Sequence, residues 1–571
     1  MSAEHTLLPS WIVRQLVVGV FPRATFHARA RLFRALERVL PVRFEPRAGG
    51  EQRALDAAIV FGDESALGEP AGAARIPALI VPEQRLADHR RMRTICLANV
   101  DRLDRRLRGR RLDSLLIGSG RLEAAPGTLD IATANHQCVW RTSARAPRTD
   151  RVAVGPVELA PGESLRDQLR DGRYLHLLPL FEFLRELTGY QPQEDHLRAT
   201  FIIDDPNLHW RSYGFIRFDT LAAHARAHGY HVTFATVPLD CWFAWPGAVR
   251  TFRTSAGTLS LVSHGAYHGY SELATQQRED AALRLFEDAT ARMNRFTRRW
   301  GVSIGPVMVP PHGLSALSVH RPLLSAGFEA LCTRLGWWAD WPEAHCAIAG
   351  IATADISPAG LSVFARHPID HAWGWGDALM SAYLDQPLVV YGHAEDLAGG
   401  YDVLGEIAAW IRESGPTRWL SLADAARTNL LGHFDAESGT FHLRLLTRRG
   451  MAIAPAGTRS LSVEGPESAD DVGWVTCAGA TFPVHFTPAG WRTEHLAWDS
   501  GRLVDVVVGR EPDERAEQRP RIAPVRAYAR RAAVEARDRL RPGVRQAGLE
   551  TPFEAFEGAV RGARNRVAAS R

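Results

Sequence analysis

Short apolar runs alternate with helical stretches through the middle of the chain, between about residues 199 and 425. Strands are expected at residues 200–203, 231–236, 259–262, 307–309, 347–352 and 387–391. Helices are expected at residues 218–227, 279–298, 405–412 and 422–428. This alternation is typical of a parallel barrel with helices on the outside, here predicted over residues 196–430.

The region before the barrel has a less regular pattern. Residues 10–46 are expected to be helical, and Leu32, Phe33, Leu36 and Leu40 recur at helical spacing. Short apolar strands are expected at residues 57–61, 76–81, 115–117, 129–141 and 151–159, with a helical stretch around residues 88–108. A helix over residues 165–188 would end at Gly189. Residues 1–195 are therefore predicted to form a small α/β domain.

The pattern changes again after Leu430, where short strands are separated by Gly, Pro and polar turns. This predicts a small β-sandwich over residues 431–509. Residues 510–571 are rich in charge and interrupted by proline, which predicts a charged helical or partly disordered tail. The expected fold class is thus α/β, a distorted (β/α) barrel flanked by these three parts. A solvated helix is the favoured interpretation of the tail, and peripheral contact with anionic lipid is the alternative.

Composition narrows the class of protein. The 571 residues are 46% hydrophobic and 23% charged, which is ordinary for globular domains, and the net charge is +4. The basic excess lies in the tail, so the body lacks the basic field of a nucleic-acid enzyme and no nucleic-acid partner is expected. All basic residues other than histidine are arginine. A GC-rich genome produces the same bias, so arginine-rich stretches here are weak signs of function.

The six cysteines are far apart and form no Cys-x-x-Cys pair, which argues against a zinc ribbon or a disulfide framework. The apolar run at residues 11–21 is interrupted by Arg14 and is too short to span a membrane. No small-residue cleavage site follows this run. A cytoplasmic location is therefore expected, with any membrane contact limited to the tail. The oligomeric state is not predicted.

Polar side chains follow several of the predicted barrel strands. The first strand runs into Asp204 and Asp205, and residues 259–262 lead to His264 and His268. Residues at the carboxyl ends of barrel strands face the active-site mouth, where one acid could bind a cation and the other act as a base. Two histidines four residues apart can present both rings to one metal. A plain turn for the acids and a chance pair among 22 histidines remain open alternatives.

Two further strands end in histidine. Residues 307–309 lead into Pro310, Pro311, His312 and Gly313, a rigid loop that could place a backbone N–H over the metal. Residues 388–391 lead to His393.

Taken in this order, the four segments resemble a divergent form of the polysaccharide deacetylase family, of the NodB-homology or carbohydrate esterase family 4 type. The resemblance covers about residues 199–425. It implies that Asp204 is the catalytic base and His393 the general acid, and that Asp205, His264 and His268 hold the metal. A backbone N–H near His312 would stabilise the oxyanion.

Three departures from the family pattern stand out. Val309 occupies the place of an arginine that restrains the catalytic aspartate in the family, and His312 replaces an aromatic residue. The fourth motif is met only loosely by residues 338–341, in which Asp340 would orient His393.

Aromatic and polar residues after the third motif are candidates for sugar binding. Trp338, Trp341 and Trp373 could stack on sugar rings, although packing inside the protein is the alternative. Residues 366–373 are polar and aromatic enough for a substrate loop, in which His371 is a second candidate for the acid. Asn207 could line the mouth.

The resemblance implies a metal-dependent hydrolase, an N-deacetylase acting on an acetylated amino sugar of a glycan or glycoconjugate precursor. Two histidines and one aspartate favour zinc, and nickel or cobalt is compatible. Two alternatives stay open. The enzyme could cleave another amide or an ester, or the barrel could be a degenerate, non-catalytic carbohydrate-binding protein.

Overall fold

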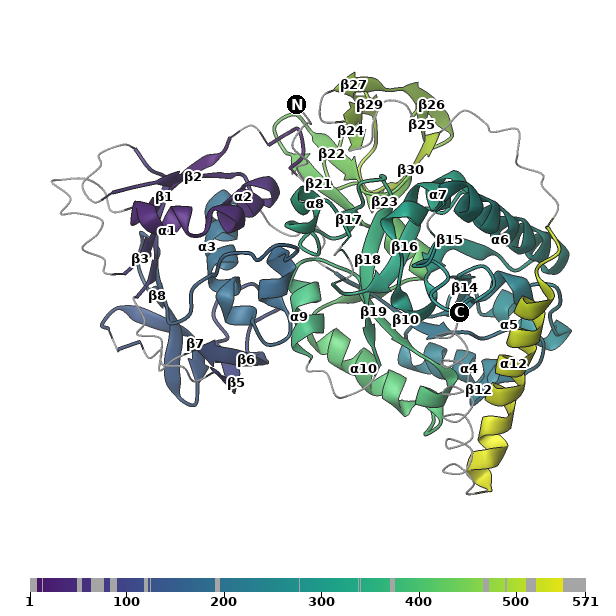
Figure 1. Ribbon diagram of the computed structural model, residues 1–571. Coiled ribbons are helices and arrows are strands. Elements are labelled where there is room, and N and C mark those ends of the chain that lie inside the picture. The colour runs from purple at the N-terminus through teal and green to yellow at the C-terminus, as the bar shows by residue number, and fades with distance from the viewer. Residues whose placement is uncertain are drawn as a thin grey trace.

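The computed structural model describes residues 8–12, 14–48, 54–62, 76–82, 90–117, 122–123, 125–189, 196–276, 278–336, 338, 340–369, 375–465, 472–487, 490–509 and 520–547. Figure 1 shows an N-terminal sheet on the left, a barrel on the right and a β-rich part at the top. The last helix, in yellow, lies on the side of the barrel away from the N-terminal sheet.

The described N-terminal residues form a nine-stranded sheet in the order β2-β1-β3-β4-β9-β8-β7-β5-β6. The half from β2 to β9 is parallel and the half from β9 to β6 is antiparallel. The strands are β1 (Leu16–Phe21), β2 (Val42–Pro46), β3 (Ala57–Phe61), β4 (Ala78–Val81), β5 (Arg90–Leu97), β6 (Arg111–Ile117), β7 (Thr128–Ala134), β8 (Gln137–Ser143) and β9 (Thr149–Val152). The helices are α1 (Arg23–His27), α2 (Ala30–Val39) and α3 (Leu178–Thr188).

Three predicted elements of this region differ in the structure. The helix α2 is confirmed, but β1 precedes it, because a run of apolar and β-branched residues is buried inside the sheet. The predicted helix around residues 88–108 is wrong. Its first part is β5, in which Ile95 and Leu97 are buried and Thr94 and Cys96 are exposed, the period of a strand. Helix α3 ends at Gly189 as predicted, but it begins only at Leu178.

The central region is a closed parallel barrel. Seven strands follow each other in the order β13-β14-β15-β16-β18-β19-β10, and β10 pairs back with β13 to close the ring. The strands are β10 (Leu197–Asp204), β13 (Val232–Thr236), β14 (Leu259–His264), β15 (Ile304–Val309), β16 (Ala330–Arg334), β18 (Ser362–Pro368) and β19 (Leu388–Gly392). The (β/α) barrel predicted from the alternation of strands and helices is therefore confirmed.

Helices connect and cover the barrel strands. They are α4 (Phe218–His228), α5 (Pro246–Thr254), α6 (Glu279–Trp300), α7 (His320–Ser325), α8 (Glu343–Cys346), α9 (Gly376–Tyr383), α10 (Asp402–Glu413) and α11 (Leu422–Arg427). Short strands complete the region: β11 (Ser212–Tyr213), β12 (Ile216–Arg217), β17 (Asp355–Ile356) and β20 (Thr417–Trp419). Buried apolar side chains from β10, β13, α4 and α10 form a core between the barrel and its helices.

One barrel strand lies elsewhere than the sequence indicates. Residues 347–352 were expected to be a strand, but they form turns in the structure, and the barrel uses β16 and β18 instead. Residues 366–368, expected at the start of a substrate loop, are the last residues of β18. The adjacent polar residues Arg366 and His367 conceal a strand that is largely buried on both faces.

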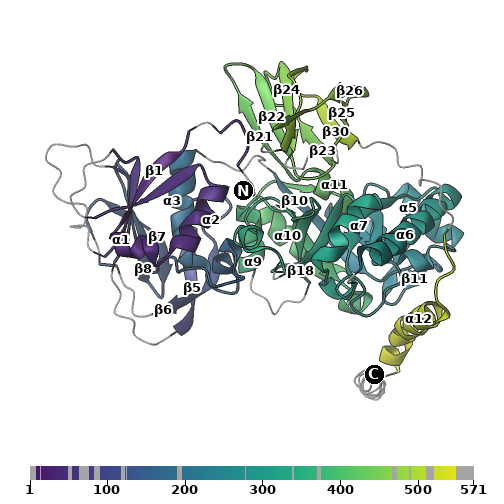
Figure 2. The same ribbon diagram turned by 45° about the horizontal axis from the view of Figure 1, so that its top comes forward.

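The β-rich part consists of two sheets that enclose a common core. The larger sheet contains β21 (Leu430–Asp435), β22 (Thr440–Leu445), β24 (Ser460–Gly465), β27 (His485–Thr487), β28 (Gly490–Arg492) and β29 (Leu496–Ala497). The smaller sheet contains β23 (Arg449–Ile453), β25 (Trp474–Cys477), β26 (Ala480–Pro483) and β30 (Leu503–Gly509). Apolar side chains from both sheets pack together, which makes this part a sandwich (Figure 2).

The tail contains one described helix, α12 (Val525–Gln546), so its helical character agrees with the sequence. A solvated helix was the favoured interpretation, and that is wrong for one face of α12. Arg531 and Asp538 are each 4% exposed because they pack against the barrel. No helix among the described residues is both long and apolar enough to cross a membrane.

Candidate metal centre

The carboxyl ends of two barrel strands bring three candidate metal ligands together. Asp204 is the last residue of β10 and Asp205 follows it, while His264 is the last residue of β14 and His268 lies in the loop after it. One ligand atom from each of Asp205, His264 and His268 lies within 4.8 Å of the others. The strands are close neighbours in the barrel, since β13 pairs with both of them.

The His264 ring is oriented for metal binding. Its Nδ1 lies 3.0 Å from the carbonyl oxygen of Val309, which can accept the hydrogen of that nitrogen. A proton on Nδ1 leaves the lone pair on Nε2, the geometry in which a histidine binds a metal and is steadied by an outer hydrogen bond. Val309, which stands in the place of the family arginine, therefore acts here through its backbone.

His268 completes the cluster from the loop. Its Nε2 lies 3.1 Å from Oδ1 of Asp205, and burial lowers its pKa to about 3. Burial also lowers the pKa of His264, against the opposing effect of Asp204 and Asp205. For Asp205, burial alone would raise the pKa, but His268 and Arg531 together lower it below the ordinary value. Two neutral imidazoles and an ionised carboxylate are the protonation states that a divalent cation requires.

The loop between the two histidines is shaped by a buried carboxylate. Glu272 accepts hydrogen bonds from the backbone N–H groups of Ala266, at 2.9 Å, and Tyr267, at 3.0 Å. Gly265 begins the loop at φ 63°, and an added Cβ there would lie 2.5 Å from a Glu272 oxygen. The loop therefore requires a glycine at this position, and Glu272 replaces the regular backbone hydrogen bonds that the turn lacks.

Three residues of the site have a left-handed backbone although they are not glycine. The φ angles are 75° for Asp205, 57° for His268 and 62° for His312. This conformation costs on the order of 1–3 kcal/mol per residue and persists only where the surroundings enforce it. Such outliers often occur at functional sites, and three of the nine among the described residues belong to the sequence motifs.

Asp204 is held by a buried arginine that no sequence motif indicates. Nη1 of Arg366 in β18 donates to both carboxylate oxygens of Asp204, at 2.8 and 2.7 Å. The side chains are 2% and 3% exposed, respectively. Burial alone would raise the pKa of Asp204, but Arg366 outweighs that effect and the pKa is lowered. A different strand thus supplies the restraint that Val309 cannot provide.

His393 follows β19 and lies beside a carboxylate. Its Nδ1 is 3.8 Å from Oδ2 of Asp396, and its side chain is 44% exposed. Burial lowers the pKa of His393, but Asp396 and the two acids Asp204 and Asp205 outweigh it and raise the pKa to about 9. His393 is therefore protonated at neutral pH. The expected partner was Asp340, which instead accepts a hydrogen bond from the Leu317 backbone at 2.8 Å.

His312 lies at the edge of the cluster. Its ring centroid is 5.8 Å from that of His268 and 5.3 Å from that of Tyr270. The side chains of His312 and Tyr270 are exposed, so they border the cluster on its solvent side. The oxyanion contact predicted for the backbone near His312 stays a prediction.

Two of the predicted sugar-binding residues, Trp338 and Trp341, are buried in a hydrophobic core. Trp338 and Trp341 are 6% and 7% exposed and pack in a hydrophobic core with side chains of α6 and α7. These two rings therefore pack inside the protein, which was the alternative interpretation, and they do not form a surface on which a sugar could stack. Trp373 and His371 lie outside the described residues. Asn207 is 1% exposed, and its Nδ2 has no hydrogen-bond partner among the described residues.

Two charged groups near the cluster come from places where the sequence carries no functional signal. Arg531 of α12 donates to Asp205 at 3.1 Å and to Asp240 at 2.7 Å. His209 is buried between the carbonyl of Asp240 and the carboxylate of Glu535. The helix α12 therefore belongs to the surroundings of the metal cluster.

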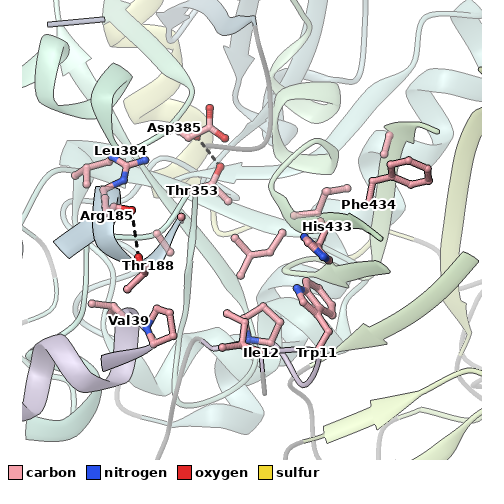
Figure 3. Close-up of a pocket in the computed structure, with 18 of the residues that line it drawn as sticks. Trp11, Ile12, Val39, Arg185, Thr188, Thr353, Leu384, Asp385, His433 and Phe434 are labelled. Atoms are coloured by element: carbon pink, nitrogen blue, oxygen red, sulfur yellow. Dashed lines mark hydrogen bonds between the residues drawn. The ribbon is translucent and has the colours of Figure 1, made fainter. Parts of the chain in front are cut away.

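A separate cavity of about 800 Å³ lies away from this chemistry (Figure 3). Its walls include Trp11 and Ile12 from the N-terminal segment, Arg185 from α3, and His433 and Phe434 from β21. His196 and Leu430, also in the wall, lie at the amino ends of β10 and β21. The cavity is thus at the opposite end of the barrel from the metal cluster and contains none of the predicted site residues.

Searches of protein-family profiles and of curated protein sequences find no match to the chain. Solved structures do match. A family 4 carbohydrate esterase from Streptomyces lividans, in complex with acetate, is 12% identical in sequence and matches with a TM-score of 0.23. The match includes 39% of this chain and 88% of the esterase chain. The polysaccharide deacetylase Bc1974 from Bacillus cereus is 11% identical in sequence and matches with a TM-score of 0.24. The match includes 40% of this chain and 92% of the deacetylase chain.

Both matches are partial similarities of fold. The resemblance is limited to about two fifths of the chain. A 4-alpha-glucanotransferase from Thermococcus litoralis matches as well, at 13% identity and a TM-score of 0.28, over 41% of this chain and 40% of that one. A shared fold does not establish a reaction, so the activity has to be argued from the site.

Proposed function

We propose that the chain is a metal-dependent hydrolase that removes an acetyl group from an acetylated amino sugar of a glycan or glycoconjugate precursor. The observation that carries the proposal is the convergence of Asp205, His264 and His268 within 4.8 Å, next to an acid held by a buried arginine. Ligands, base and acid come from the carboxyl ends of three barrel strands, β10, β14 and β19, where the active sites of such barrels lie.

The residues fit a divalent cation. Two imidazoles and one carboxylate form a common catalytic zinc set that leaves positions open for water and substrate. The orientation of His264 by Val309 agrees with this, because a proton on Nδ1 leaves the Nε2 lone pair for the ion. We infer zinc as the ion, and nickel or cobalt would suit the same ligands. When bound, the ion would lower the pKa of a water molecule and polarise the acyl oxygen.

The protein groups supply proton transfers around that chemistry. Asp204, ionised because Arg366 lowers its pKa, accepts the proton of the attacking water. Arg366 also fixes the carboxylate in one orientation, since its guanidinium contacts both oxygens. His393, protonated at neutral pH because Asp396 raises its pKa, donates a proton to the leaving amine. The backbone near His312 is the candidate donor to the oxyanion.

The test is release of acetate from acetylated amino sugars and short glycans by the zinc-loaded protein. We expect turnover by the natural protein and a fall in kcat of about 10²-fold or more in Asp204→Asn, because a positioned general base contributes roughly that factor. Equal rates for both proteins would refute the mechanism.

Two controls separate the alternatives. Esters and other amides tested beside the sugars distinguish a change of substrate from a loss of catalysis. Metal analysis distinguishes an enzyme from a binding protein with a degenerate barrel. Natural protein that neither retains nor binds zinc would support the non-catalytic alternative.

A further inference from the structure

Helix α12 is attached to the barrel mouth by charged side chains spaced along its length. Glu535 faces His209 at 3.3 Å, Asp538 accepts a hydrogen bond from Tyr213 at 2.5 Å, and Arg541 pairs with Glu395 at 2.6 Å. Ala523, just before the helix, packs with Val237 and Leu239 after β13. The helix therefore has a defined position against the loops that follow β10, β13 and β19.

Arg531 makes the deepest of these contacts. Nη1 donates to Oδ1 of Asp205 at 3.1 Å, and Nη2 donates to the backbone oxygen of the same residue at 3.3 Å. Nε and Nη2 also contact Oδ2 of Asp240, at 3.1 and 2.7 Å. One guanidinium, 4% exposed, thus joins the loop after β10 to the loop after β13.

The contact with Arg531 holds Asp205 in its left-handed backbone conformation. Asp205 has φ 75°, and the guanidinium binds its carboxylate and its backbone oxygen together. Both ends of the residue are therefore restrained in the conformation that turns the carboxylate toward His264 and His268. Asp240 in turn fixes the guanidinium, and a lysine ammonium could not form this planar fork of bonds.

We propose that Arg531 is a positioning residue of the metal centre, and that α12 is needed for full metal affinity because it carries this arginine. The inference rests on the proposed metal site and adds a requirement that the barrel alone does not show. Arg531 could also weaken metal binding, since a positive charge 3.1 Å from a ligand oxygen repels a cation. The two effects predict opposite changes in metal affinity when Arg531 is replaced.

The experiment measures zinc affinity of the full chain by competition with a chromogenic chelator. We expect Arg531→Lys to weaken zinc binding by about 10- to 100-fold, the usual effect of losing an outer partner of a metal ligand. Arg541→Ala removes a charge from the same helix without touching Asp205, and we expect it to bind zinc as the natural protein does. Unchanged or tighter binding by Arg531→Lys would overturn the proposal.

Two further variants exclude a simple loss of folding. In Arg531→Met with Asp240→Asn only Asp205 loses its arginine, and it keeps His268 at 3.1 Å, so the melting temperature should recover in part while zinc affinity stays low. In Arg531→Ala, added guanidinium ion should restore zinc affinity, and tetramethylammonium should not. Recovery of full affinity in the double variant, or no rescue by guanidinium, would contradict a positioning role.

The outcomes also separate this inference from the proposed function. If the natural protein does not bind zinc, nickel or cobalt, both fail. If it binds zinc and Arg531→Lys binds equally well, only the positioning of Asp205 by Arg531 is refuted.

Discussion

The pair formed by Asp204 and Arg366 gives the sharpest test of the site. Replacing Arg366 with methionine keeps much of the side-chain volume and leaves the Asp204 carboxylate buried without its cation. Removing one partner of a buried ion pair costs about 3–5 kcal/mol. The guanidinium also lies 4.1 Å from the centre of the Tyr391 ring, a contact worth up to about 2 kcal/mol when desolvated. We therefore expect Arg366→Met to lower the free energy of unfolding by about 4 kcal/mol.

The same change should abolish the base. A carboxyl that is fully buried without a partner has its pKa raised by up to about 3–5 units. Asp204 would then be partly protonated at neutral pH, and kcat should fall by about 10²-fold or more. Urea unfolding followed by circular dichroism measures the first effect, and acetate release at several pH values measures the second. Activity of Arg366→Met should recover partly at alkaline pH, where Asp204 ionises again.

A matched pair and a double variant serve as controls. Arg427 and Glu329 form a similar two-bonded ion pair that is 15% and 17% exposed, so Arg427→Met should cost only about 1 kcal/mol and leave kcat unchanged. Arg366→Met with Asp204→Asn leaves no buried charge and should regain most of the stability but no activity. A loss below about 1 kcal/mol with normal kcat in Arg366→Met would refute the reasoning.

The remaining predictions concern the acid, the tryptophans and the metal. The pKa of His393 is raised to about 9, above the roughly 6.5 of the unfolded chain. Protonated His393 therefore stabilises the fold fully below about pH 6.5, and this stabilisation is lost as the pH rises through 9. Asp396→Asn should therefore move the alkaline limb of kcat/KM to lower pH, and an unmoved limb would exclude His393 as the acid. Trp338→Ala should lower the free energy of unfolding by about 3–5 kcal/mol and leave KM unchanged, whereas a raised KM would restore its sugar-binding role. Zinc should raise the melting temperature of the natural protein but not of His264→Gln, and an equal rise in both would place the ion elsewhere.

The parts of the site that the sequence revealed are those tied to a local pattern. Asp204, His264 and His393 each follow an apolar run, and the end of a buried strand is visible in the order of residues. Parallel strands also place their ends on one face of a barrel, so the clustering of these residues follows from the order of strands and helices along the chain. The alternation of strand and helix indicated the barrel for the same reason.

The parts that were missed depend on contacts distant in the sequence. Arg366 is 162 positions from Asp204, in a strand whose charged residues look like a loop. Arg531 is 326 positions from Asp205, in a segment whose composition suggests solvation. A charged side chain can be buried when a partner of opposite charge pairs with it. Which residue is that partner depends on the tertiary structure and cannot be read from the local sequence. The strand β5 was missed because its alternation is short and begins in a run of arginines.

The left-handed backbones of Asp205, His268 and His312 have a consequence for directed evolution of this protein. Glycine adopts such a conformation without the steric cost that a side chain meets, and at the exposed His312 no buried ion pair opposes this gain in folding stability. A library selected for heat resistance alone would therefore favour His312→Gly, a change at the border of the metal cluster. Selections on this scaffold should therefore score turnover together with melting temperature.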